Sequence, residues 1–352
     1  MIFILVTVII IITLILIPGF TPSIKDKQGN KVPGSIASIE KVIIGEKEQW
    51  ILIRGADITK PILLFLHGGP GSSEMFLLRK YTQELEKHFL VVTWDQRGAG
   101  KSYQAINPHA SITINQFVLD TGELTKLLCD RFNQKKIFLV GHSWGSAIGV
   151  LSVQKFPDLF YAYIGIGQIV NMYDNERISY EWTLAQATKA KDEQAIKTLT
   201  EIGSPPYTGD WLKKLITQRG LLGKFGGELY GSSKGAMPLI LKSLIFATEY
   251  SLIDKVNFFR GIFASNKLLW QQLLTIDLTK QATIFKMPIY FVLGRHDYEV
   301  PSILAEPYFN IIEAPHKELI WFENSAHFAN IEEKEKFSNL LINSLLLASI
   351  SA

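Results

Sequence analysis

Short, uninterrupted apolar runs recur along the first half of the chain and end in glycine or polar residues. The clearest runs span 61–67, 89–94 and 136–141. Because they lack the alternation of a strand with one wet face, they are typical of strands buried on both faces of a parallel sheet. Two earlier segments, 35–45 and 49–54, flank a glycine-containing turn. They predict a pair of strands joined by that turn.

Amphipathic segments separate these runs. Residues 72–88 and 113–132 carry apolar side chains at helical spacing, which predicts two helices. A further strand is predicted at 160–167. Strands that alternate with helices indicate an α/β fold, with a mostly parallel central sheet flanked by helices.

The pattern changes in the middle of the chain. From 171 to 274 helical stretches such as 179–202 alternate with glycine and proline breakers, and no buried strand is evident. The α/β rhythm resumes at 287–294 and 318–322 and ends with a helix at 332–347. This pattern predicts a helical cap inserted into the α/β core. We expect a linker at 20–35, core segments at 36–170 and 276–352, and the cap at 171–275.

The first residues form a different kind of segment. Residues 1–17 are apolar except for Thr7 and Thr13, and Pro18-Gly19 ends the run. At about 1.5 Å per residue, a helix of this length just crosses a bilayer core. No lysine or arginine precedes the run and no small-x-small cleavage site follows it, unlike a secretory signal. We therefore expect an N-terminal hydrophobic helix at 1–19 that anchors the protein in a membrane by a single pass, with a cleaved signal and secretion as the alternative.

Composition narrows the function classes. The chain has 352 residues, of which 47% are hydrophobic and 20% charged, as expected for a globular protein with a substantial core. The formal net charge of +3 is nearly balanced, and without a basic tract we expect no nucleic-acid partner. The single cysteine, Cys129, cannot form an internal disulfide.

The most informative motif follows the strand at 136–141. It reads Gly141-His142-Ser143-Trp144-Gly145 and passes directly into small, helix-compatible residues. A strand, a sharp turn and a helix present the apex serine above the sheet, and the turn needs small residues on both sides. The motif predicts Ser143 as a nucleophile.

A serine hydroxyl needs a general base that a third group orients. In this architecture the partners follow in the order serine, acid, histidine, each just after a strand. Asp297 follows the strand at 287–294, and His327 follows the strand at 318–322. We expect His327 to shuttle the proton and Asp297 to orient it. The other histidines are expected to be structural or solvated: His88, His109, His142, His296 and His316.

Acyl transfer also needs donors for the oxyanion. The N–H after the nucleophile, from Trp144, is one candidate. The second should come from the loop 67–71, His-Gly-Gly-Pro-Gly, whose glycines allow close approach to the substrate. We expect the Gly69 N–H, with Gly68 as the alternative.

Together these motifs resemble the α/β-hydrolase superfamily and, within it, the proline iminopeptidase group. The resemblance covers about 36–350 and rests on the segments 67–71, 94–102 and 141–145 and on the loops of Asp297 and His327. It implies an α/β-hydrolase fold and the removal of an N-terminal residue, usually proline, from small peptides. It also implies a serine mechanism without metal or cofactor, in which acidic residues of the cap and nearby loops bind the free amino group.

The acidic residues are the least defined part of this resemblance. The segment 248–261 resembles the family segment that carries one such acid, which makes Glu249 the first candidate. Glu299 lies close after the predicted triad aspartate, and Glu181 lies in a loose echo of the family's cap motif. For Asp95 and Arg97 we expect a structural ion pair or turn rather than substrate contact.

We therefore expect a serine aminopeptidase that acts on a short peptide or small molecule through an acyl-enzyme. Two alternatives stay open. A carboxylesterase or amide hydrolase of small hydrophobic substrates would need no free amine, and a paired cap carboxylate facing Ser143 would argue against it. A non-catalytic binding protein on the same scaffold would not react with a fluorophosphonate at Ser143.

Overall fold

The structure, a computed structural model, describes residues 17–107 and 111–350. In this part of the chain an eight-stranded sheet has the order β1-β2-β4-β3-β5-β6-β7-β8. The β1–β2 and β2–β4 pairs are antiparallel, and the others are parallel. The strands are β1 (Ile36–Ile44), β2 (Lys47–Gly55), β3 (Ile62–Leu66), β4 (Leu90–Asp95), β5 (Ile137–His142), β6 (Phe160–Ile166), β7 (Ile289–Gly294) and β8 (Lys317–Phe322). The predicted α/β-hydrolase fold is confirmed.

The central strands are apolar because both of their faces are covered. Every residue of β3 is buried. Leu64 belongs to the core cluster that contains Phe117 and Ile148 of the helices on one face. Phe65, the next residue, belongs to the cluster on the opposite face, where its ring lies 6.5 Å from that of Phe337. Successive side chains of a strand point to opposite faces, so a continuous apolar run fills both layers.

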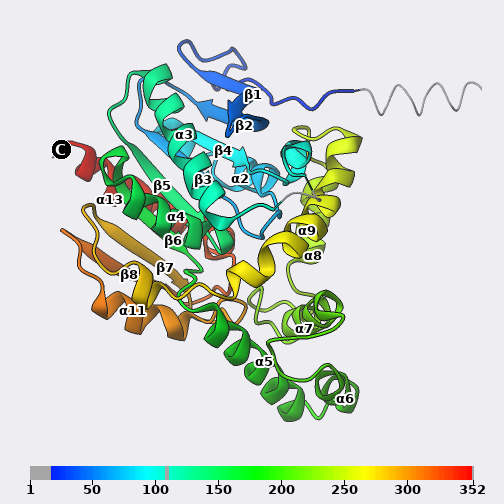
Figure 1. The fold of residues 1–352 in the computed structure, drawn as a ribbon. Helices are drawn as coiled ribbons and strands as arrows, with labels where there is room; N and C mark the ends of the chain where they lie inside the picture. Colours follow the sequence, from blue (N-terminus) through cyan, green and yellow to red (C-terminus); the bar gives the residue numbers. More distant parts are fainter. Residues whose placement is uncertain (1–16, 108–110, 351–352) are drawn as a thin grey trace, which may run out of the picture.

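The flanking helices are visible in Figure 1 on either side of the sheet. The predicted helix at 72–88 is shorter than expected, because the α-helix ends at Tyr81 and a separate turn follows at Leu85–Lys87. The core helices are α2 (Met75–Tyr81), α3 (Ile114–Phe132), α4 (Trp144–Lys155), α11 (Ala305–Ile311), α12 (Ala329–Glu332) and α13 (Lys334–Ile350).

A helical layer separates β6 from β7 in the sequence and lies along one end of the sheet (Figure 1). The predicted helical stretch 179–202 is two helices, because Lys191 has a positive φ of 54° and Asp192 caps the second helix. A capping box between Ser251 and Asp254 starts the longest of these helices, which satisfies N–H groups at its first turn. The layer contains α5 (Met172–Lys189), α6 (Glu193–Ile202), α7 (Trp211–Lys224), α8 (Met237–Ile245), α9 (Leu252–Leu273) and α10 (Leu278–Gln281).

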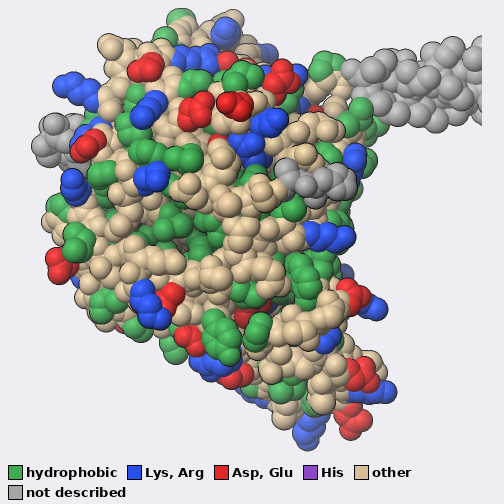
Figure 2. All heavy atoms as spheres, in the orientation of Figure 1, with side chains coloured by type: hydrophobic (Ala, Val, Ile, Leu, Met, Phe, Trp, Pro, Cys, Tyr) green, Lys and Arg blue, Asp and Glu red, His purple; other side chains and the backbone are tan. Residues whose placement is uncertain are grey.

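The predicted membrane location is corrected. The expected anchor at 1–19 falls almost wholly on residues 1–16, which lie outside the described residues. From residue 17 onward, where the structure describes the chain, no helix is both long and apolar enough to cross a membrane. On the face drawn in Figure 2, basic and acidic side chains are interspersed, in line with the nearly balanced net charge.

Candidate active site

Ser143 lies at a sharp turn between β5 and α4. Its backbone has φ 53° and ψ −120°, a strained conformation for a residue with a side chain. A Cβ atom on Gly145 would lie 2.2 Å from the carbonyl oxygen of Leu66, and one on Gly141 would lie 2.3 Å from the carbonyl oxygen of Gly145. Both flanking glycines are therefore needed for the strand, turn and helix to pack this closely.

Asp297 and His327 meet at the same end of the sheet. His327 Nδ1 lies 2.9 Å from Asp297 Oδ2, and both residues are buried. The other carboxylate oxygen, Asp297 Oδ1, accepts the backbone N–H groups of Glu299 and Val300 at 3.0 and 2.9 Å. Because the carboxylate is held by the backbone, its remaining oxygen fixes the orientation of the imidazole.

Ser143 and His327 line one cavity of about 440 Å³. The core loops form one wall, and α5, α7, α8 and α9 contribute the other. This volume falls in the range of sites for small ligands, which are usually apolar with a few placed polar groups. Its apolar lining includes Leu215, Ile216, Ile240, Ile262, Phe263 and Trp270.

The glycine-rich loop after β3 also lines this cavity. The N–H of Gly68 donates to Glu74 Oε1 at 3.1 Å. His67 is a structural residue, since its two ring nitrogens contact the carbonyl oxygen of Gly68 at 2.7 Å and the N–H of Gln96 at 3.1 Å. Gly69 has a φ of 121°, a conformation that requires glycine. Because the N–H of Gly68 already donates to Glu74, the N–H of Gly69 is the better candidate oxyanion donor of the two.

Trp144 is the first residue of α4. The first N–H groups of a helix have no acceptor within the helix. The indole Nε1 of Trp144 donates to Gln96 Oε1 at 3.0 Å, so its side chain is fixed below the turn. The backbone N–H of Trp144 therefore follows Ser143 directly and has no acceptor within α4.

Glu74 connects the loop to the residue before the serine, and sequence reasoning missed it. Its Oε1 atom accepts the Gly68 N–H and lies 2.6 Å from His142 Nδ1. The sequence offered only an acidic residue three positions after the motif 67–71, and its burial is seen in the structure alone.

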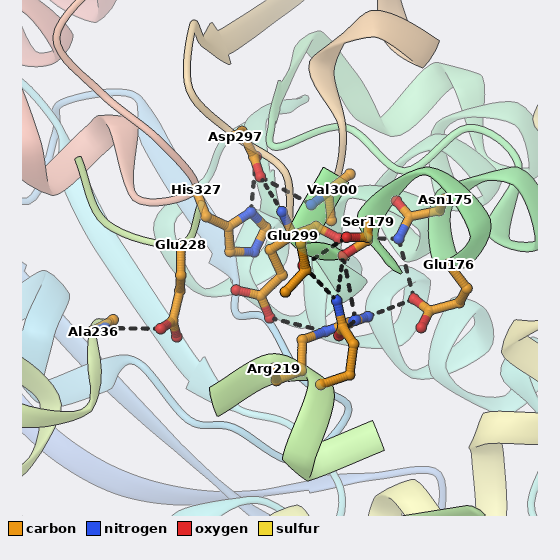
Figure 3. A network of polar contacts seen from close by, with 12 residues as sticks. Asn175, Glu176, Ser179, Arg219, Glu228, Ala236, Asp297, Glu299, Val300 and His327 are labelled. Atoms are coloured by element: carbon orange, nitrogen blue, oxygen red, sulfur yellow. Dashed lines mark hydrogen bonds and ion pairs between the residues drawn. The ribbon is translucent and has the colours of Figure 1, made fainter. Parts of the chain in front are cut away.

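Three carboxylates and one guanidinium lie on the cap side of the same cavity (Figure 3). Arg219 of α7 donates to Glu176 of α5, and its Nε lies 3.9 Å from Glu299 Oε1. Glu228, in the loop between α7 and α8, accepts the N–H of Ala236 at 2.8 Å. The sequence predicted Glu299 but missed Glu176 and Glu228, which carry no motif and lie in a helix and a glycine-flanked loop.

Burial and mutual repulsion set the electrostatics of this cluster. Burial, with a contribution from the charge of Glu299, raises the pKa of Glu228 to about 7, although the Ala236 N–H acts in the opposite direction. Burial alone would lower the pKa of His327, but the charges of Asp297 and Glu299, the hydrogen bond to Asp297 and the charge of Glu228 raise it to about 9. The cavity therefore favours positive charge.

The other predicted substrate contacts lie elsewhere. Glu249 is buried against Arg79, whose Nε is 3.2 Å from Glu249 Oε1, and is not part of the cavity lining. Glu181 is exposed and pairs with Arg177 at 3.0 Å. The acidic wall of the cavity is therefore formed by Glu176, Glu228 and Glu299. Of the three predicted acids, only Glu299 belongs to it.

Asp95 and Arg97, for which we expected structural contacts, have buried partners in the core. Arg97 pairs with Asp120 at 2.9 Å, and Asp95 accepts the hydroxyl of Tyr250 at 2.7 Å. Within the described residues, no group of three or more histidine, cysteine or acidic side chains is arranged to hold a metal ion.

Comparison with known proteins places this geometry in a family. The sequence profile of the alpha/beta hydrolase fold matches residues 61–187. The protein named "Probable aminopeptidase YbaC" of Bacillus subtilis is 37% identical over 308 residues, covering 87% of this chain and 96% of that protein. A proline iminopeptidase of Thermoplasma volcanium is 25% identical over 290 residues, covering 82% and 89%.

Solved structures show the same fold. A proline iminopeptidase-related protein from Thermus thermophilus aligns with a TM-score of 0.63 at 21% identity, covering 88% of this chain and 98% of that one. These matches confirm the resemblance drawn from the motifs. The chain is a hydrolase of the α/β-hydrolase family and belongs to its proline iminopeptidase-like group.

Proposed function

We propose that this protein is a serine aminopeptidase that releases an N-terminal residue from a short peptide. Ser143 attacks the carbonyl carbon of that residue while His327 accepts the hydroxyl proton through Nε2. His327 then returns the proton to the departing amide nitrogen, and an acyl-enzyme remains on Ser143. Water, deprotonated by His327, hydrolyses this ester and frees the amino acid. Asp297 holds the imidazole and stabilises its cationic form.

The oxyanion is held by the N–H groups of Gly69 and Trp144. The Gly68 N–H is the weaker candidate because it already donates to Glu74 at 3.1 Å. Two preorganised backbone donors beside the nucleophile stabilise the charge of the tetrahedral intermediate without reorganising.

The single observation that carries the peptidase proposal is the carboxylate excess in the cavity of Ser143. Glu176, Glu228 and Glu299 line it together with the guanidinium of Arg219. The other lining cation, Lys234, is exposed, and a fourth lining carboxylate, Glu74, faces His142. Arg219 is closest to Glu176, so Glu228 and Glu299 are the carboxylates left to receive an ammonium group. An esterase of neutral, hydrophobic substrates has no use for buried carboxylates, which are costly without a cation.

The comparisons support the same substrate class. Relatives that match most of this chain carry the names aminopeptidase and proline iminopeptidase, so an N-terminal proline is the first residue to test. The apolar part of the cavity suits a small, uncharged ring or side chain.

The test compares proline β-naphthylamide, its N-acetylated form and a short p-nitrophenyl ester as substrates. We expect rapid cleavage of the free-amine amide only, loss of all activity in Ser143→Ala, and a raised KM for the amide in Glu299→Gln. Glu181→Gln, an exposed carboxylate outside the cavity, is the matched control and should behave as the wild type. Equal cleavage of the free and acetylated amides would refute the aminopeptidase.

A further inference from the structure

The residues that carry these two carboxylates, Glu228 and Glu299, line the same cavity as His327 and are connected to its surroundings through their backbones. The backbone N–H of His327 donates to the carbonyl oxygen of Glu228 at 3.0 Å. The backbone N–H of Glu299 donates at 3.0 Å to Asp297, the carboxylate that orients the imidazole. Figure 3 shows the carboxylates of Glu228 and Glu299 on the same side of the His327 ring as Arg219. The amine site and the general base thus form one connected unit.

We propose that the substrate's own ammonium group, by binding to Glu228 and Glu299, releases the proton that these carboxylates hold on His327 and so switches on the general base. This inference rests on the proposed aminopeptidase function and deepens it. The amino group of the substrate then promotes the proton transfer in addition to contributing to binding.

The physical basis is competition between two cations for the same carboxylates. In the empty cavity the imidazolium of His327 is the cation that Glu228 and Glu299 stabilise, and their charges help to raise the pKa of His327 to about 9. A protonated imidazole cannot accept the proton of Ser143. An ammonium group against the carboxylates neutralises them, which removes their stabilisation of the imidazolium.

The other charged groups around His327 do not offer the same switch. Asp297 is committed to Nδ1 and to two backbone N–H groups, and it stays in place throughout the cycle. Glu228 and Glu299 line the cavity that a substrate would enter, so a second cation can reach both carboxylates. Seven charged or titratable groups face His327 or its direct partners: Asp297 and Glu299 after β7, Glu228 and Arg219 from the cap side, His142 at the end of β5 with its partner Glu74, and Glu332 of α12.

Removal of a cavity carboxylate should have opposite effects on the reaction rates of substrates with and without an amino group, which simple amine binding does not predict. Substrates without an amino group meet a protonated His327 and react slowly at neutral pH. Removing one cavity carboxylate should therefore speed the reaction of such substrates while it slows the reaction of free-amine substrates. A carboxylate that only binds the amine would slow the second class and leave the first unchanged.

The test uses a neutral fluorophosphonate, which labels Ser143 at a rate that follows the deprotonated fraction of His327. In the wild type we expect the labelling rate to rise with a midpoint near pH 9. In Glu228→Gln and in Glu299→Gln the midpoint should fall by about one pH unit, which is the usual size of a neighbouring-charge effect. At pH 7 such a shift makes labelling about tenfold faster. Glu181→Gln should keep the wild-type midpoint.

A second measurement needs no variant. In the wild type, the pH profile of kcat for proline β-naphthylamide should rise at a lower pH than the profile for a p-nitrophenyl ester. Coincident profiles, or unchanged labelling midpoints in both glutamine variants, overturn the inference even if free-amine amides are strongly preferred. If the midpoints fall but free and acetylated amides are cleaved equally, the charge coupling stands and the aminopeptidase function fails.

Discussion

His142, the neighbour of Ser143, holds the residue that we propose as the general base: its Nε2 donates to the carbonyl oxygen of His327 at 2.9 Å. The two ring centroids lie 4.7 Å apart. The other nitrogen, Nδ1, faces Glu74 Oε1, which also accepts a backbone N–H. His142 thus links the loop of His327 to the buried carboxylate of Glu74. Burial acts to raise the pKa of Glu74, but the interactions with His142, His67 and the Gly68 N–H together outweigh it, and the pKa is lowered.

Glu74→Gln should weaken both the fold and the catalytic geometry. The neutral amide is a weaker acceptor than the buried carboxylate for the Gly68 N–H and His142 Nδ1, which costs about 2 kcal/mol in the free energy of unfolding. Urea unfolding measures this loss, and kcat for proline β-naphthylamide should fall more than KM rises. Glu84→Gln, which disturbs only an exposed pair with Lys87, is the control. Equal stability of the two variants would contradict the role of Glu74.

Gly145→Ala should destabilise the protein strongly. The added methyl would lie 2.2 Å from a backbone carbonyl oxygen of Leu66, so β3 and α4 would have to separate, at a cost of about 3 kcal/mol. Gly220→Ala in α7 is the matched control, because nothing lies within 4 Å of its added Cβ. That change should stabilise the protein by about 0.8 kcal/mol through helix propensity. Thermal unfolding should therefore shift in opposite directions for the two variants.

Arg219→Leu should lower the free energy of unfolding, because it leaves the carboxylates of the cavity without their guanidinium. Glu176 is buried and loses its cation, and removing one partner of a buried ion pair costs about 3 kcal/mol. The loss should shrink as the pH falls toward 4, since protonation then removes the unpaired charges. Arg177→Leu removes an exposed guanidinium from Asp174 and Glu181 and should leave the stability nearly unchanged, because solvent screens such pairs. A loss that does not depend on pH would contradict the electrostatic explanation.

The pH dependence of stability should carry a signature of His327. Its pKa in the folded protein is about 9, above the unfolded value of about 6.5. The native state therefore binds this proton more tightly, and the stabilisation is complete below about pH 6.5 and is lost as the pH rises through 9. We expect the difference in Tm between the wild type and His327→Gln to shrink from pH 6.5 to pH 9 in scanning calorimetry. Parallel curves would show that the histidine is not protonated in the native state at neutral pH.

Sequence patterns predicted those features of this protein that depend on neighbouring residues, such as buried strands and the turns that follow them. The runs of β3, β4 and β5 are apolar because both faces of each strand are covered, so their burial was visible in single segments. The order Ser143, Asp297, His327 predicted a meeting point because the carboxyl ends of parallel strands share one edge of the sheet. The roles of these three residues remain predictions, although Asp297 lies 2.9 Å from His327.

The acidic wall could not be predicted in this way. Glu228 faces the cavity because a loop between two cap helices turns it there, and its backbone is held by Tyr298 and His327, far away in sequence. Glu249 lies beside a tyrosine and a helix start that match the family pattern, yet Arg79 of the core neutralises it. Side chains placed by tertiary contacts leave no periodic trace in the sequence.

The backbone connection between the cap loop and the catalytic loops also constrains how this enzyme can evolve. The carbonyl oxygens of Gly227 and Glu228 accept the N–H groups of Tyr298 and His327 at 3.0 Å each. An insertion or deletion in this loop would alter the surroundings of the histidine at the same time as the shape of the pocket. Substitutions on the apolar wall around Ile240 and Phe263 would instead change the lining of the pocket without touching either of these hydrogen bonds.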